Sequence, residues 1–498
     1  MPPKVAYPTA GKASSRIRQA CDVCHTRKIR CDGRRPCMNC RLARVDCTYN
    51  AVPKKTGPKG PRLKPASWSE TEVEFRPSPL VSADLFRRYL DVYFIRKYPI
   101  TPILDRNCME ECVSTYSESP EKYGLLTSCC ATIALDSEVL LQKFEPTPAH
   151  LLSSAQPSVI LPTPEFFVQE TLRARRHIHL AESLSLTHIY TSFFLSHAFF
   201  CLNNGNAAWV YLRESVTILQ TLRLHEEATY SETRNQTVAT YSRRMFWTLF
   251  VTERSFTIQR ERPLTLLPTI NLPKVDPLSP DAEILAGFLD LVSLFLPFDF
   301  DFITTMNLPI SPALKTTKAT QFRRLQDKLS NCLAKISHYP EAQQADLLVT
   351  REWLKIIVWK ICVSKSLLSS STNSRDSMSL SYPSSIARET VLISRLLPSK
   401  AFEANGVAIL EKVFDVGCSL ADVLSLNPHP PSSVWSAMDV GPIDVLVEIV
   451  RIAGTKFGDG YQHLRILVDK TYRCVLMNVD RSLPLPTNAS RVQAEEID

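Results

Sequence analysis

The 498-residue sequence is poor in glycine and has no hydrophobic run at its N-terminus. Thirteen glycines, and no series of alternating Val/Ile-rich segments with hairpin turns, argue against an all-β protein. Residues 1–20 contain no apolar stretch of the kind that directs secretion. Because disulfides persist in oxidising compartments, we do not expect the cysteines to form a disulfide framework.

The sequence also lacks the common motifs of catalysis. It contains no phosphate-binding glycine-rich loop with Lys-Ser/Thr, no Gly-x-Ser-x-Gly elbow and no His-Glu-x-x-His zinc motif. The nearest approach, His225-Glu226, has no second histidine at the required spacing. We therefore expect that the protein is not an enzyme, and the alternative is a catalytic pocket that carries no recognisable motif.

No hydrophobic segment is suited to crossing a membrane. The most apolar stretch, residues 284–303, is interrupted by Pro297 and by Asp290, Asp299 and Asp301. Charges in the middle of a membrane span are costly. We expect a buried helix that ends near Pro297, and no membrane partner.

Cysteine, in contrast, is concentrated near the N-terminus. Six cysteines fall within residues 21–47, in two copies of the pattern Cys-x2-Cys-x6-Cys: Cys21, Cys24, Cys31, Cys37, Cys40 and Cys47. Structural zinc takes four ligands, so two zinc ions need eight ligand positions. Six thiolates fill eight positions only if two of them bridge both metals. We expect His25 to face solvent or a phosphate, and the repeated close spacings of an iron–sulfur site are absent.

The residues from Arg18 to Cys40 resemble the fungal binuclear zinc cluster regulators, in which six cysteines hold two zinc ions beside DNA. This resemblance implies a cofactor of two Zn²⁺ ions. It also implies that Cys21 and Cys37, the first cysteine of each half, bridge the two metals. The spacing alone does not reveal which sulfurs bridge.

The charge distribution indicates a polyanionic partner for the N-terminal segment. Residues 1–64 contain 16 Lys and Arg against three acidic residues, whereas the other residues contain 42 basic and 47 acidic groups. A basic segment joined to a slightly acidic remainder is typical of nucleic-acid binding. We expect the partner to be double-stranded DNA.

Within the cluster, the sequence from Asp22 to Arg30 predicts one short helix, with an acidic residue in its first turn and cations at its end. By the resemblance, Lys28 reads base edges by donating to guanine. The other cations are expected to contact phosphates: Arg27, Arg30, Arg18 and Arg16. The sequence from Cys37 to Cys47 predicts a matching helix with phosphate contacts from Arg41 and Arg44, after a turn at residues 32–36.

A basic, Gly- and Pro-rich segment follows the cluster and predicts an extended arm. Its cations are expected to contact the DNA backbone, direct nuclear import, or both: Lys54, Lys55, Lys59, Arg62 and Lys64. The alternative is a solubilising linker. No heptad pattern lies between Trp68 and Ile95, so a homodimer and its half-site spacing are left open.

The rest of the chain predicts a large helical domain. Apolar residues recur at helical steps between Ala208 and Leu224, and the same pattern predicts helices over residues 85–95 and 184–202. The segment from Gly205 to Trp247 resembles the regulatory domain that accompanies fungal zinc clusters, although Glu261 replaces the glycine of a Gly-Arg-Pro turn. We expect Trp209, Phe246 and Trp247 to pack in the core.

Two other features of this region carry weaker expectations. Residues 369–385 are rich in serine and predict a mobile loop. Nine further cysteines are expected to be buried free thiols.

The predicted fold class is a small N-terminal binuclear zinc cluster DNA-binding domain, a basic linker and a large all-α regulatory domain. The expected segments are a disordered tail (1–15), the zinc cluster (16–50), the linker (51–79), the helical domain (80–480) and a second disordered tail (481–498). The predicted function is a nuclear transcription activator of a metabolic or secondary-metabolite gene cluster, which binds CGG-type half-sites through the zinc cluster and contacts the transcription machinery. The resemblance allows a small-molecule effector. The alternatives are a zinc-stabilised protein-interaction scaffold or a metabolite-sensing repressor without base readout.

Overall fold

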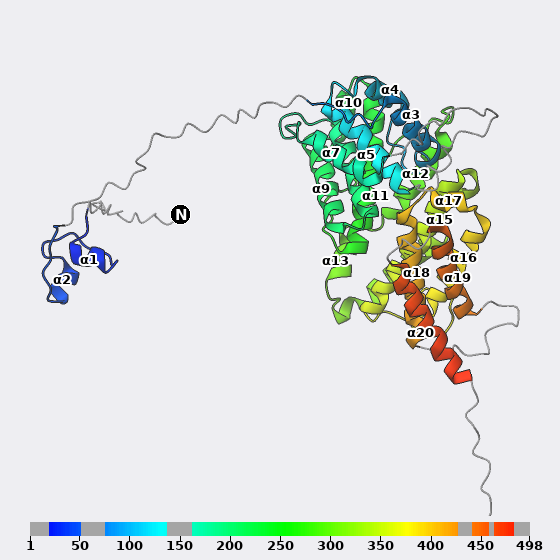
Figure 1. The fold of residues 1–498 in the computed structure, drawn as a ribbon. Coiled ribbons are helices and arrows are strands. Elements are labelled where there is room, and N and C mark those ends of the chain that lie inside the picture. Colours follow the sequence, from blue (N-terminus) through cyan, green and yellow to red (C-terminus); the bar gives the residue numbers. More distant parts are fainter. Residues whose placement is uncertain (1–18, 51–74, 137–161, 427–440, 458–462, 483–498) are drawn as a thin grey trace, which may run out of the picture. The chain divides into compact units, whose positions relative to one another are not determined.

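The computed structural model describes residues 19–50, 75–136, 162–426, 441–457 and 463–482, and these residues fall into two compact units. The first unit lies within residues 1–73 and the second within residues 74–498 (Figure 1). In the described ranges both units consist of helices and turns, without strands. Some residues with predicted roles lie outside these ranges: Arg16, Arg18, Lys54, Lys55, Lys59, Arg62 and Lys64.

The first unit contains two five-residue helices, α1 (Asp22–Thr26) and α2 (Met38–Leu42). The helices predicted over 22–30 and 37–47 are therefore too long. Each helix ends early because the backbone turns to the left-handed conformation shortly after it, at Lys28 (φ 51°) and Arg44 (φ 50°). The turn at residues 32–36 is present, and Gly33 takes a positive φ of 72° there.

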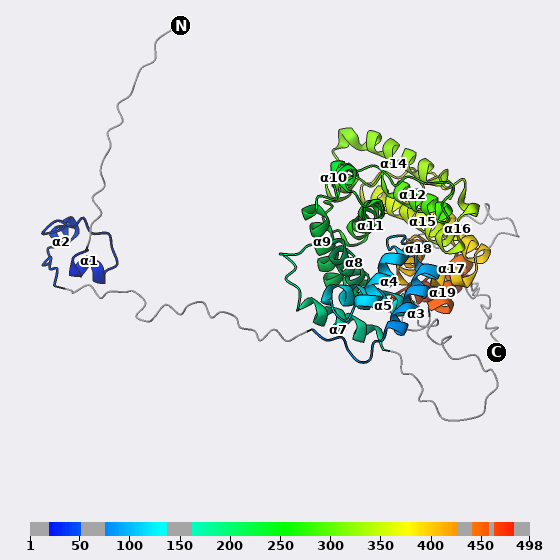
Figure 2. The same cartoon turned by 90° about the horizontal axis from the view of Figure 1, so that it is seen from above.

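The second unit is a bundle of α-helices with short π- and 3₁₀-helical turns (Figures 1 and 2). Its N-terminal part contains α3 (Ala83–Val92), η1 (Tyr93–Lys97), α4 (Arg106–Thr115), α5 (Pro120–Asp136), α7 (Pro164–Arg175), α8 (Leu186–Cys201), α9 (Gly205–Thr221), α10 (Glu227–Glu232), α11 (Gln236–Arg260), α12 (Ala282–Phe295) and α13 (Phe300–Asn307). Its C-terminal part contains η3 (Pro312–Leu314), α14 (Lys315–Ser330), η4 (Ile336–His338), α15 (Glu341–Ser364), α16 (Tyr382–Leu396), α17 (Ser399–Glu403), α18 (Val407–Leu426), α19 (Pro442–Phe457) and α20 (Leu464–Ser482).

Helix α9 shows how the apolar pattern forms this bundle. The Asn204 side chain caps the helix by accepting from the Ala207 N–H. Leu212, Val216 and Leu219, at helical steps, are all fully buried. The helix packs along α8, and Figure 2 shows the two side by side. The predicted helical face is confirmed.

Two apolar clusters form the core of this unit, and helix α15 belongs to both. Trp353 and Leu354 lie in the larger cluster, with the N-terminal helices. Ile356 and Trp359 lie in the smaller cluster, with α16, α18, α19 and α20. Because α15 is buried on nearly all sides, it joins the two halves of the bundle.

Most of the strongly apolar segment at 284–303 is buried, although Leu296 and Phe300 are exposed. It forms α12, which ends at Phe295 just before Pro297, as predicted, and Phe288 and Phe295 are almost fully buried. Across the described ranges, every helix is too short or too polar to span a bilayer.

The serine-rich segment is folded by its own hydrogen bonds. Ser369 N donates to Met378 O (2.8 Å), and the Ser379 hydroxyl donates to Ser371 O (2.8 Å). Met378 and Ser379 are buried, and α16 begins at Tyr382, inside the segment predicted as a loop. The serine hydroxyls bond to the backbone of the loop, so the segment is more ordered than its composition indicates.

The prediction that the nine cysteines outside the zinc cluster are buried free thiols is confirmed for five of them. Buried free cysteines outside the zinc cluster are Cys129, Cys130, Cys362, Cys418 and Cys474. Cys108 is exposed, so the prediction is wrong there, because the first turn of α4 lies at the surface, with Arg106 and Asn107 exposed as well. The remaining three cysteines are half-buried: Cys112, Cys201 and Cys332. Phe246 and Trp247 are in the core as predicted, and Trp209 is half-buried.

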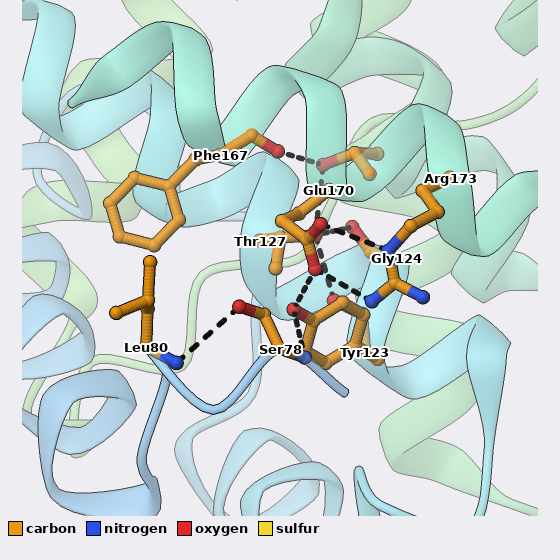
Figure 3. Close-up of polar contacts among 9 residues, drawn as sticks. Ser78, Leu80, Tyr123, Gly124, Thr127, Phe167, Glu170 and Arg173 are labelled. Carbon is orange, nitrogen blue, oxygen red and sulfur yellow. Dashed lines mark hydrogen bonds and ion pairs between the residues drawn. The ribbon is translucent and has the colours of Figure 1, made fainter. Parts of the chain in front are cut away.

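The first described segment of the second unit is fixed to the bundle by a polar cluster (Figure 3). Ser78 N donates to the Tyr123 hydroxyl (3.3 Å), which donates to Glu170 (2.5 Å). Arg173 pairs with the same carboxylate through two nitrogens (2.9 and 2.7 Å). Burial raises the pKa of Glu170, but the hydrogen bonds from Arg173 and Tyr123 outweigh this effect and hold the pKa below its ordinary value.

The buried face of α9 predicts a large difference between two neighbouring substitutions. Leu212→Ala should lower the free energy of unfolding by about 2–5 kcal/mol, because it leaves a cavity beside α8. Val210→Ala on the exposed face should change it by less than about 1 kcal/mol. Urea unfolding of the full chain, followed by the helical circular dichroism signal, measures both. Equal effects would contradict the assigned packing of α9.

Candidate metal centre and nucleic-acid interface

The six N-terminal cysteines form two overlapping groups of four sulfurs. One group contains Cys21, Cys24, Cys31 and Cys37, and the other contains Cys21, Cys37, Cys40 and Cys47. Within each group the sulfurs all lie within 4.8 Å of one another. Only Cys21 and Cys37 belong to both groups, so they occupy the positions that bridging ligands would take.

The distances between the sulfurs fit a zinc site. Cys21 Sγ lies 3.6 Å from both Cys37 Sγ and Cys40 Sγ, and Cys24 Sγ lies 3.6 Å from Cys37 Sγ. A tetrahedron with Zn–S distances of about 2.3 Å has sulfurs about 3.8 Å apart. A disulfide would need about 2.0 Å. The six residues therefore fit two metal ions, and His25 is exposed and belongs to neither group.

The two shared sulfurs have a backbone environment that favours the thiolate. Cys21 caps α1 and accepts from Cys24 N (3.5 Å), and Cys37 caps α2 and accepts from Cys40 N (3.4 Å). The N–H of Cys24 lowers the pKa of the Cys21 thiol to about 6, against the opposing effect of burial. The N–H of Cys40 likewise lowers the pKa of Cys37. Burial instead raises the pKa of Cys24 to about 12.

Polar contacts tie the two halves of the cluster together. The Asp22 carboxylate accepts from the Thr48 hydroxyl (2.8 Å) and from Asn50 N (2.7 Å), which joins the start of the unit to its end. The Asn39 side chain donates to Arg30 O (2.7 Å), which joins α2 to the segment after α1. These contacts hold the basic segments against the sulfur cage.

Each half of the cluster ends its helix with the same turn. Lys28 N donates to His25 O (3.2 Å) and Ile29 N donates to Cys24 O (3.1 Å). The second half repeats this pattern, with Arg44 in the position of Lys28. This arrangement is a Schellman turn, whose left-handed position is usually glycine. A cation stands there in both halves.

The cations of the cluster that the structure describes are available for a partner. They are exposed and form no ion pair with any described acidic residue: Arg27, Lys28, Arg30, Arg41 and Arg44. Arg35 instead lies over the Tyr49 ring (4.6 Å), and the Tyr49 hydroxyl donates to Arg34 O (3.1 Å). The stacked Arg35 was not anticipated from the sequence.

The equivalence of Lys28 and Arg44 was also missed, although the repeat contains the signal. Lys28 follows Cys21 at the same distance in sequence as Arg44 follows Cys37. Aligning the two halves therefore places both cations at one structural position. The left-handed backbone there has no sequence signature, because neither residue is glycine.

Two charged residues that are adjacent in sequence, Glu253 and Arg254, are buried near the end of α11. Glu253 is fully buried and accepts from Arg213 (2.6 Å), from the Thr265 hydroxyl (2.6 Å) and from Leu266 N (2.7 Å). The neighbouring Arg254 is also buried and donates to Leu266 O (3.0 Å). Both residues anchor the segment after α11. Glu261, in the place of the expected glycine, has a left-handed φ of 52°.

Comparison with known proteins agrees with both units. The fungal Zn(2)-Cys(6) binuclear cluster domain matches residues 19–56, and the fungal specific transcription factor domain matches residues 90–389. The probable sucrose utilization protein SUC1 of Candida albicans is 27% identical over 82% of this chain and 79% of its own length.

Two proteins of Saccharomyces cerevisiae are also similar. The maltose fermentation regulatory protein MAL13 is 22% identical over 83% of this chain and 85% of its own length. The respiratory transcription factor ZNF1 is 22% identical over 97% of this chain and 99% of its own length. Together with the sulfur cage and the helical bundle, these matches show that the chain belongs to the fungal-specific transcription factors, with an N-terminal Zn(2)-Cys(6) cluster that binds two zinc ions.

Proposed function

We propose that this transcription regulator acts in the nucleus as an activator of genes for sugar use, and that its zinc cluster reads CGG-type half-sites. The names of its relatives, which concern sucrose and maltose, favour a catabolic target over secondary metabolism. The basic N-terminal segment supports binding to duplex DNA. None of the enzyme motifs sought in the sequence is present, and we propose no catalytic role.

The single observation that carries the proposal is the repeated turn at Lys28 and Arg44. A non-glycine residue in the left-handed region costs free energy, and strain of this kind is common at functional sites. In both halves the strained residue is an exposed cation beside the sulfur cage. We assign Lys28 to base readout and Arg44, with Arg27, Arg30 and Arg41, to phosphate contacts.

The zinc ions would hold this arrangement rather than take part in chemistry. A unit with two five-residue helices has too little apolar core to fold without its metals. The cage residues are Cys21, Cys24, Cys31, Cys37, Cys40 and Cys47, with Cys21 and Cys37 bridging.

A second candidate is a zinc-stabilised scaffold that binds protein and does not read bases. The salt dependence of duplex binding separates the two. Neutralising several phosphates gives a linear fall of log K with log salt, of slope about −0.9 per contact. A scaffold would show no steep fall and no preference for CGG-containing duplexes.

The shared sulfurs predict unequal losses of zinc from two cysteine variants. Cys21→Ala removes a ligand from both groups and should release both zinc ions and unfold the cluster. Cys47→Ala removes a ligand from one group and should leave at least one zinc bound. Elemental analysis of the purified full chain gives the zinc content. Equal zinc content in both variants would contradict the bridging assignment.

The repeated turn predicts different outcomes for Lys28→Gly and Arg44→Gly. Glycine suits the left-handed backbone, so both variants should keep their zinc and their fold. Lys28→Gly should reduce discrimination between a CGG site and a mismatched site by about 1–3 kcal/mol. Arg44→Gly should weaken binding to both duplexes alike. Fluorescence anisotropy with the two duplexes measures this, and equal weakening by Lys28→Gly would show that Lys28 contacts phosphate.

A further inference from the structure

The loop between α13 and α14 contains a serine whose hydroxyl is not engaged. The sequence has four Ser-Pro pairs, at Ser78, Ser119, Ser279 and Ser311. Serine followed by proline is the substrate of proline-directed protein kinases, which need an accessible hydroxyl in an extended backbone. The four serines therefore differ as substrates according to their exposure and their hydrogen bonds.

Three of the four serines are half-buried and already form a hydrogen bond. Ser78 Oγ accepts from the backbone N–H two residues later (3.3 Å), and Ser119 Oγ accepts from the backbone N–H three residues later (3.3 Å). The Ser279 hydroxyl donates to Asp281 (2.5 Å). A kinase can reach these hydroxyls only after the local structure has opened.

Ser311 differs from the other three. It is exposed, and its hydroxyl makes no hydrogen bond with any residue in the described ranges. Its backbone is extended, with φ −62° and ψ 145°, and Pro312 begins the 3₁₀-helix η3 directly after it. The residues on both sides, 307–309 and 312–317, are exposed as well. A kinase can therefore bind this segment without unfolding the bundle.

The helix that follows Ser311 begins with an excess of positive charge. The 3₁₀-helix continues directly into α14, whose first turn contains Lys315 and Lys318 and no acidic residue. Lys318 pairs with Asp301 (2.9 Å), whereas Lys315 is exposed and forms no ion pair with a described residue. Cations at the start of a helix oppose its macrodipole, and an anion there is favourable. An anionic group at Ser311 would correct this imbalance.

A third lysine reaches the same loop from another helix. Lys365, which follows the last residue of α15, donates to Leu308 O (2.9 Å), three residues before Ser311. Lys365 is half-buried and forms no ion pair with a described acidic residue. Helices α14 and α15 pack against each other, as Figure 2 shows. Lys315 and Lys365 therefore bring cations from both helices to this loop without carboxylate partners in the described ranges.

We propose that Ser311 is a phosphorylation site, and that its phosphate joins the start of α14 to the end of α15 through Lys315 and Lys365. The phosphoryl donor is the magnesium complex of ATP, and the catalyst is a proline-directed kinase. The Ser311 Oγ bonds to the γ-phosphorus as the bond to the β–γ bridging oxygen breaks, so ADP leaves. The hydroxyl proton passes to the catalytic aspartate of the kinase.

A phosphate fits this position in charge and in hydrogen bonding. It carries a charge of about −1.5 to −2 near pH 7 and three acceptor oxygens, which can pair with the two ammonium groups. Because α15 belongs to both apolar clusters, this contact would hold the loop before α14 to the helix that joins the two halves of the bundle.

The first test is the rate of phosphorylation at each Ser-Pro pair. The full zinc-loaded chain is incubated with a cyclin-dependent kinase and magnesium ATP, and tandem mass spectrometry follows each site with time. Ser311 should be modified at least about fivefold faster than Ser78, Ser119 and Ser279, because the other hydroxyls must first leave a hydrogen bond. Short peptides that span the four sites correct for the sequence preference of the kinase.

The second test measures the ionisation of the phosphate. Phosphorus NMR of the phosphorylated chain identifies the Ser311 phosphate by its loss in Ser311→Ala. Its second pKa should lie below the ordinary value of about 6, because nearby cations favour the dianion. The double variant Lys315→Gln/Lys365→Gln should raise this pKa toward the ordinary value. Lys274→Gln is the matched control, because Lys274 is an exposed lysine between α11 and α12, and it should leave the pKa unchanged.

Two results would overturn the proposal: Ser311 is modified no faster than the other serines after correction by the peptide rates, or the double variant leaves the phosphate pKa unchanged. Thermal melting shows that each variant is folded. Neither measurement depends on zinc content or on binding of a CGG duplex. A failure here would leave the proposed function intact, and a loss of sequence-specific duplex binding would leave the phosphorylation site intact.

Discussion

The membership of Cys21 and Cys37 in both groups of four sulfurs is the constraint on which the N-terminal unit depends. Cys21 and Cys37 each cap a short helix, and each sulfur accepts a backbone N–H that stabilises its negative charge. The metals therefore fix the starts of both helices relative to each other. Each helix then ends in the same turn, which places a cation, Lys28 or Arg44, in the left-handed conformation.

The helical unit depends on burial rather than on metal. Helix α15 belongs to both apolar clusters, and the buried Glu253 and Arg254 hold the segment after α11. A polar cavity lies among α8, α11, α15 and α18. Polar groups inside a core are tolerated when they are hydrogen-bonded, and the hydroxyls on α11 meet this condition by donating to their own helix.

The sequence predicted the residue types and the broad arrangement better than the local backbone. Cysteine spacing identified the sulfur cage, apolar periodicity placed α8 and α9, and an apolar run that ends near Pro297 placed α12. It missed the early ends of α1 and α2, because a left-handed Lys28 or Arg44 has no signature in composition. It missed the cavity because Thr248, Thr252 and Ser255 become neighbours of Asp346 and Lys412 only through tertiary packing.

The central claim is that two zinc ions share sulfurs in a single cage. X-ray absorption at the zinc edge of the full chain tests it most directly. The account predicts four sulfurs around each zinc at about 2.3 Å, no nitrogen ligand, and a second zinc as a nearby scatterer. A first shell that includes imidazole nitrogen, or two zinc sites without a metal–metal signal, would contradict it.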